Sequence, residues 1–226
     1  MLPAQRLVPV VALALLGALG LAGCRAQPTV AAYVDQTKIT EEQVDAMVAD
    51  AKAKAATPEE QGTQAPGRGD VVSTIVLNPL CDEVQRQQGF NKPPVSTEQI
   101  KQSEGTPSNS EFAKIRANLW SCLSGVPVGT QEPTDAELRE IYDLAKAAGA
   151  VDVPYEDIRA QLAADQSVRQ ALAIDRTLTE AAKAKDITVN PRYRPLMFPV
   201  FTLQSGDAIV SIPMGELGSG AVRDLS

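Results

Sequence analysis

The sequence predicts a mainly α-helical domain whose first and last strands pair in a small β-sheet. Between residues 41 and 185, apolar residues recur at helical spacing, and several such runs begin with a Ser or Thr followed three positions later by Gln or Glu. After residue 186 the chain becomes rich in β-branched and aromatic residues, which favour strands. Aromatic residues make up only 4% of the chain, so we expect a core of Ala, Val, Leu and Ile.

Charge and composition exclude several classes of function. The chain has 21 Lys and Arg against 28 Asp and Glu, a net charge of −7. Nucleic-acid binding needs a basic face, so we expect no nucleic-acid partner. The chain contains no histidine, which removes Ser-His-Asp catalysis, Cys-His catalysis and histidine metal sites. We expect neither a cofactor nor a metal.

Residues 1–23 have the pattern of an export signal. Arg6 precedes an uncharged run from Leu7 to Gly23 that ends in small residues, which is typical of a secretory signal with a processing site. The run is at the short end for a membrane-spanning helix. An uncleaved signal anchor is the alternative interpretation.

The tetrapeptide Leu21-Ala22-Gly23-Cys24 resembles the bacterial lipobox. In that family the chain is cut before the cysteine, here between Gly23 and Cys24, and the cysteine thiol receives a diacylglycerol. The new amino terminus is usually acylated as well, which fits the marginal membrane binding of a single acyl chain. The resemblance implies an extracytoplasmic protein that is anchored to the cell membrane through Cys24, with residues 24–29 as a tether.

The domain is predicted over residues 30–213, followed by a flexible tail, 214–226. It opens with a strand at Val30–Val34 and a turn at residues 35–38. Near its end, Ile187 to Asn190 are expected to pair with the opening strand, and "LMFPVFTL" and "AIVSIP" flank the turn signal "QSGD" as a hairpin. The predicted helices follow residue 40 and occupy residues 71–89, 95–105, 109–125, 132–149 and 155–185.

Local signals refine these helices. Pro79 predicts a kink or a break near Asn78, and an irregularity is possible at Asp165. The helix over 109–125 is expected to turn Ile115 and Leu119 inward. Residues 57–70 read as a polar loop, in which Arg68-Gly69-Asp70 is taken as a chance triplet. Three capping boxes are predicted, formed by Thr40 with Gln43, Ser96 with Gln99, and Thr134 with Glu137.

Two cysteines, Cys81 and Cys122, remain besides the lipobox cysteine. In an exported chain such a pair usually forms a disulfide, and two buried free thiols are the alternative. A metal site built from two cysteines without histidine is not expected. Their spacing excludes a Cys-x-x-Cys redox motif.

Several segments resemble the SurA and PrsA group of extracytoplasmic foldases. The stretch "VAAYVDQTKITEEQVDAMV" is similar to the start of that group, and "EPTDAELREIYD" to the helix before its parvulin-type prolyl isomerase module. The stretch from "VPYEDI" to "VNPRY" is similar to the segment on the C-terminal side of that module. The module itself is missing near residues 149–154, and its active-site histidines have no counterpart. The resemblance implies a chaperone-like helical domain without isomerase activity.

We therefore expect a lipid-anchored protein that binds unfolded or exported polypeptides. The alternative is an adaptor or scaffold with one dedicated folded partner. We do not expect an enzyme, because the residues that could act as catalytic groups have no partner base or metal-binding set in the sequence. Those residues are Tyr142, Tyr155, Asp157, Asp165 and Asp175.

Overall fold

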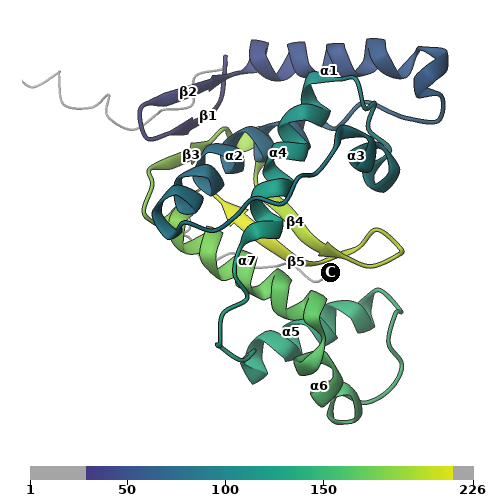
Figure 1. Cartoon of the computed structure of the whole chain (residues 1–226), viewed down its shortest axis with the longest axis vertical. Helices are drawn as coiled ribbons and strands as arrows, with labels where there is room; N and C mark the ends of the chain where they lie inside the picture. The colour runs from purple at the N-terminus through teal and green to yellow at the C-terminus, as the bar shows by residue number, and fades with distance from the viewer. Residues whose placement is uncertain (1–28, 216–226) are drawn as a thin grey trace, which may run out of the picture.

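The structure is a computed structural model that describes residues 29–215 (Figure 1). This part contains seven α-helices and two small antiparallel sheets, so the fold is mainly α, as predicted. The lipobox residues Gly23 and Cys24, nearly all of the expected tether, and residues 216–226 lie outside the described residues. Within residues 29–215, no helix combines the length and the apolar character needed to cross a membrane.

The two ends of the domain meet in a three-stranded sheet. Strand β1 (Val30–Val34) lies between β2 (Thr37–Thr40) and β3 (Ile187–Val189), and both pairings are antiparallel. Ala32 is opposite Val189, and the backbone N–H of Asn190 donates to the carbonyl of Ala31 at 2.9 Å. The predicted pairing of the first strand with Ile187–Asn190 is therefore confirmed.

Strand β2 was not expected, because residues 35–38 were assigned to a turn. The turn takes up only Asp35 and Gln36, and Thr37 already pairs with Val34. Asp35 has a φ of 52°, in the left-handed region that Asp tolerates better than most residues. Its carboxylate accepts a hydrogen bond from the backbone N–H of Asp186 at 3.1 Å, which helps to hold this turn against β3.

The helices follow the predicted order, and all three predicted capping boxes form. The long predicted segment 155–185 is divided at Asp165, whose side chain accepts hydrogen bonds from the backbone of Ser167 and Val168 and so caps the next helix. The helices are α1 (Glu41–Ala55), α2 (Arg68–Gln88), α3 (Thr97–Glu104), α4 (Glu111–Gly125), α5 (Asp135–Ala147), α6 (Tyr155–Ala164) and α7 (Gln166–Lys183).

Helix α2 differs from the prediction at its start and at Pro79. It begins at Arg68, because Asp70 accepts a hydrogen bond from the backbone N–H of Gly67 at 3.1 Å and caps the first turn. The triplet from Arg68 to Asp70 is thus helical rather than part of a loop. Of the kink or break predicted near Asn78, the break does not occur, since the helix continues through Pro79. Pro79 lies on the exposed side of α2, and the buried residues on the opposite side keep the helix in place.

Helix α2 forms the centre of the main core. It packs against α1, α4, α7 and strand β4 (Leu196–Thr202), and Val71, Val72 and Leu77 are completely buried. Leu119 of α4 is also completely buried, as expected. A disulfide between Cys81 of α2 and Cys122 of α4 joins these helices inside the core, with 6.1 Å between the two Cα atoms.

The predicted hairpin is present and links two parts of the molecule. Strand β4 pairs with β5 (Ala208–Met214), which extends one residue into the region assigned to the tail. Met214 is buried there. Residues Ile209 and Val210 of β5 also join a second apolar cluster with α5, α6 and α7. Figure 1 shows α5 and α6 at the end of the molecule opposite to β1, β2 and α1.

Candidate functional site

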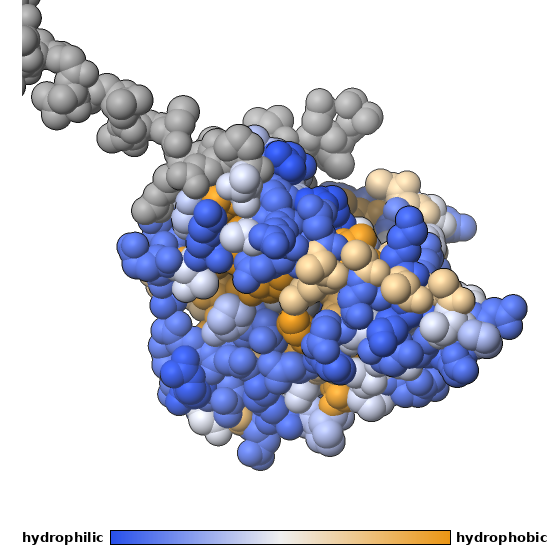
Figure 2. Space-filling view, turned by 90° about the horizontal axis from the view of Figure 1, so that it is seen from above, coloured by the Kyte–Doolittle hydropathy of each residue, from blue (hydrophilic) through white to orange (hydrophobic). Residues whose placement is uncertain are grey.

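Among the described residues, grooves are better candidate sites than flat apolar patches. Val153 is the one large hydrophobic residue in this part that is clearly exposed. In the view of Figure 2, hydrophobic side chains lie between hydrophilic ones and form no broad uninterrupted patch. A binding surface for apolar ligands must therefore come from half-buried side chains that line a depression.

One such depression is an apolar groove of about 490 Å³ between the β1–β2 hairpin, α1, α2 and α4. Its volume falls within the range of roughly 300–1,000 Å³ that is usual for ligand sites. Ile115 was expected in the core, but it is half-buried and borders this groove. We call this depression the methionine groove; its apolar lining includes Val34, Met47, Ile75, Pro79 and Ile115.

The floor of the methionine groove is an adaptable apolar surface. Met47 is half-buried, and a methionine side chain adjusts easily to different partners. Pro79 has no N–H, so the carbonyl of Ile75, four residues earlier, lacks its usual helical donor. Both residues line the groove. The floor can therefore accept apolar side chains.

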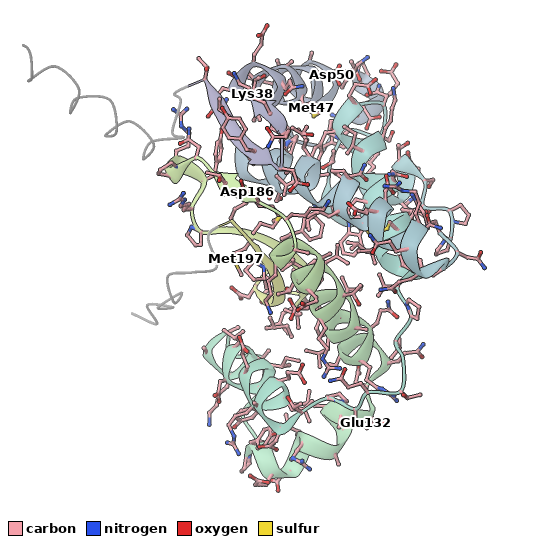
Figure 3. All side chains as sticks on the ribbon, turned by 90° about the vertical axis from the view of Figure 1, so that its left-hand side faces the viewer. Lys38, Met47, Asp50, Glu132, Asp186 and Met197 are labelled. Carbon is pink, nitrogen blue, oxygen red and sulfur yellow. A yellow bond between two sulfur atoms is a disulfide. The ribbon has the colours of Figure 1, made fainter. Side chains whose placement is uncertain are left out.

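Charged residues border the methionine groove. The Nζ atom of Lys185 lies 2.9 Å from a carboxylate oxygen of Glu83 and 3.2 Å from one of Asp35. These carboxylates, Glu83 first, raise the pKa of Lys185. The pKa of Asp35 is lowered, mainly by the backbone N–H of Asp186 and then by Lys185. Lys38 is exposed and has no ion pair within the described part of the chain; Figure 3 labels it near Met47.

A second groove, of about 720 Å³, lies between α3, α4, the loop at residues 64–67 and strand β4. It contains Trp120, the single tryptophan of the chain, and we call it the tryptophan groove. Strand β4 borders this groove, but it is a poor template for pairing with an added peptide strand. Pro199 has no backbone N–H to donate, and the β4–β5 register shifts directly after Pro199.

The polar groups of the tryptophan groove are occupied by one another. Arg116 is 7% exposed, and its Nε donates to the two carboxylate oxygens of Glu104 at 3.0 and 2.8 Å. Its Nη1 donates to Thr74 at 3.0 Å, and its guanidinium lies 4.4 Å from the ring centroid of Phe198. The indole N–H of Trp120 donates to Glu104 at 2.6 Å. This network holds α2, α3, α4 and β4 together, so we assign it to the fold.

Two further ionic networks are structural. Glu41, 8% exposed, contacts Arg68 and accepts a hydrogen bond from the hydroxyl of Tyr193 at 2.6 Å, which ties α1 and α2 to the segment after β3. Arg68 is therefore engaged within the fold. In the second network, hydrogen bonds from Arg176 and then Thr134 lower the pKa of Glu137 to about 2 and join α5 to α7.

The residues considered for an enzyme do not converge on one site. Tyr142 donates to the carbonyl of Val153 at 2.9 Å, and Tyr155 donates to Asp135 at 2.8 Å. Asp157 is exposed on α6, and Asp165 caps α7. Burial raises the pKa of Asp175, whose carboxylate accepts from Thr179 at 3.0 Å. Within residues 29–215, no cluster of His, Cys, Asp and Glu side chains is suited to a metal ion.

The predicted site residues are separate from the grooves. Cys81 and Cys122 lie in the core, and Cys24 is outside the described residues. No groove residue could be nominated from the sequence; the available signal was Pro79, a helix-interrupting residue within an apolar stripe. Comparison of the chain with protein-family models, with curated proteins and with solved structures finds no match.

Proposed function

We propose that this protein is an extracytoplasmic lipoprotein that binds unfolded or exported polypeptides in the methionine groove, in a chaperone-like manner and without prolyl isomerase activity. The observation that carries this proposal is the groove itself. It has an apolar floor of half-buried side chains that includes an adaptable methionine, Met47. Apolar grooves of this kind are a recurring mode of polypeptide recognition.

The expected affinity suits a protein that holds polypeptides and then releases them. Burying one large aliphatic side chain contributes about 1.5–3 kcal/mol. Two or three such side chains in the groove, set against the cost of immobilising a flexible segment, give a dissociation constant on the order of micromolar to millimolar. Binding of this strength is reversible and tolerates many sequences.

The position of the groove relative to the proposed anchor supports capture near the membrane. Five residues separate Cys24 from Val30, where β1 begins. Even a fully extended chain of this length spans only about 20 Å. The groove is built from β1, β2, α1 and their neighbours, so it belongs to the end of the domain that directly follows the tether. An anchored protein would therefore present this groove close to the lipid surface.

Two features of the sequence support the proposed absence of isomerase activity. The segment between Ala147 and Tyr155, where the foldases that it resembles carry their isomerase module, is a short connection between α5 and α6. The chain also contains no histidine. A proline-isomerisation assay with a chromogenic peptide should show only the uncatalysed rate.

Suppression of client aggregation tests the proposed binding. The full-length protein, at a several-fold molar excess, should slow the light scattering of a chemically unfolded client. Met47→Asp places a charge on the groove floor and should remove this protection. Ala49→Asp is the matched control, because Ala49 is exposed on α1 outside the groove. Equal protection by both variants, each with an unchanged circular dichroism spectrum, would contradict the assignment to this groove.

Two further measurements separate the proposal from its alternatives. Cys24→Ala should abolish incorporation of labelled fatty acid and release the protein from the membrane fraction. A variant that still incorporates the label would exclude the lipobox interpretation. Crosslinking in cells should capture many incompletely folded clients. A single stoichiometric folded partner would instead favour the adaptor alternative.

A further inference from the structure

The last described residue of the chain is held at a defined place beside strand β3. Strand β5 ends at Met214, which is buried, and Gly215 follows with a φ of 85°. Gly215 packs closely on β3, because a Cβ built on it would lie 2.8 Å from the Cγ2 atom of Val189. This contact fixes the point from which the chain continues into residues 216–226.

Lys185 connects this point to the methionine groove. A cavity of about 370 Å³ is lined by Gly215, by the end of α7, by β3 and by Lys185. Lys185 also lines the methionine groove. In the view of Figure 3, Asp186, the residue after Lys185, lies between Met47 in the groove and Met197 on β4. A segment that continues from Gly215 therefore starts one side chain away from the groove.

The sequence after Gly215 combines a linker with apolar side chains. Residues 216–226, which we call the C-terminal segment, lie outside the described residues and have the sequence ELGSGAVRDLS. Residues 218–220, Gly-Ser-Gly, have the composition of a linker. Val222 and Leu225 follow this linker. The seven residues from Gly215 to Val222 span up to about 25 Å when extended, which is sufficient for both apolar side chains to reach the floor of the adjoining groove.

We propose that the C-terminal segment occupies the methionine groove when no client is bound, with Val222 and Leu225 on its apolar floor. This inference rests on the proposed function, because it assigns a regulator to the same groove. The segment covers Met47 and Ile115, which are half-buried and line the groove. A client with a longer apolar stretch buries more surface there and displaces the segment.

The expected competition is weak, so clients can displace the segment. A segment on a short linker acts at an effective concentration in the millimolar range. Two aliphatic side chains in the groove give an intrinsic dissociation constant at the weak end of the range expected for clients, about millimolar. The C-terminal segment then fills the groove about half of the time, and its loss should tighten client binding about twofold or more.

The methyl group of Met47 reports directly on occupancy of the groove. In full-length protein with isotope-labelled methionine methyl groups, the double variant Val222→Asp/Leu225→Asp should shift the Met47 resonance, because charged side chains leave the apolar floor. The resonance of Met197, which lies on β4 and does not line the groove, should stay in place. Fluorescence anisotropy with a labelled leucine-rich peptide should show that this variant binds the peptide about twofold or more tightly than the wild type.

A matched control keeps the added charge and the position in the chain. Ser219→Asp/Ser226→Asp introduces the same two charges into the same segment but leaves Val222 and Leu225 unchanged. It should give the Met47 resonance and the peptide affinity of the wild type. A synthetic peptide with the sequence of residues 216–226, added at millimolar concentration to the Val222→Asp/Leu225→Asp variant, should return the Met47 resonance toward its wild-type position.

The outcomes separate this inference from the proposed function. If both double variants give the wild-type Met47 resonance, or shift it alike, the apolar residues of the C-terminal segment do not occupy the groove and the inference is wrong, while polypeptide binding still depends on the aggregation assay. If the Met47 resonance moves with protein concentration and not with the substitutions, a second copy covers the groove, and the inference is again wrong. If the resonance shifts as expected but Met47→Asp has no effect on aggregation, the occupancy stands and the proposed function fails.

Discussion

The disulfide between Cys81 and Cys122 should be a major source of stability for this domain. The two cysteines are 41 positions apart, and both side chains are completely buried. In the chain-entropy model, closing a loop of this length in the unfolded state stabilises the folded state by about 4 kcal/mol. Domains typically have a free energy of unfolding of about 5–15 kcal/mol. The double variant Cys81→Ala/Cys122→Ala should thus remain folded but lose a large part of its stability.

Urea unfolding followed by circular dichroism measures this loss. The double variant should unfold at a lower urea concentration and with a steeper dependence on urea, since its unfolded chain exposes more surface. Wild-type protein unfolded under reducing conditions should match the variant, which controls for the loss of the buried sulfur atoms. A free energy of unfolding within about 1 kcal/mol of the oxidised wild type would refute this reasoning, because the loop would then contribute almost nothing.

Four further substitutions test the core, an ion pair and two glycines. Leu119→Asp puts a charge in a fully buried position and should lower the melting temperature in calorimetry by about 10 °C or more; an unchanged value would contradict the packing of α4. Glu137→Gln should cost about 2 kcal/mol at pH 7 and little near pH 2, because the pKa of Glu137 is lowered to about 2 in the folded protein and its stabilising effect is lost as the pH falls from about 4.5 toward that value. A cost independent of pH in urea unfolding would exclude this. Gly125→Ala should destabilise by about 2 kcal/mol, because its Cβ would lie 2.0 Å from the carbonyl oxygen of Asn91. Gly69→Ala, with no atom within 4 Å, should stabilise helix α2 by up to about 1 kcal/mol, and equal effects of the two substitutions would show that the close approach at Gly125 is absent.

Sequence reasoning located the helices well where their signals are local. A capping box needs only two residues three positions apart, so the starts at Thr40, Ser96 and Thr134 could be predicted without knowledge of the tertiary structure. The division at Asp165 follows from the same local chemistry, because an aspartate side chain can cap the helix that comes after it.

Features that depend on distant partners were harder to predict. The sequence predicts a four-residue turn at 35–38, whereas the turn has only two residues and strand β2 begins at Thr37. So tight a turn needs Asp35 in a left-handed conformation, and neither an aspartate nor the residues beside it require that conformation. Pro79 predicted a kink or a break, and burial of the opposite side of α2 keeps the helix continuous. Ile115 follows the helical period of a core residue but is only half-covered, so periodicity alone did not reveal the groove.

The central position of β1 also affects how the domain bears mechanical load. Any pull through the chain that precedes residue 29 enters the fold at the first residue of β1, which is paired with β2 on one side and β3 on the other. Hydrogen bonds between antiparallel strands run perpendicular to the strands. A force directed along β1 therefore loads the bonds of both pairings together in shear, instead of opening them one at a time. An anchor of the kind proposed for Cys24 would therefore transmit tension to the domain in this shear geometry.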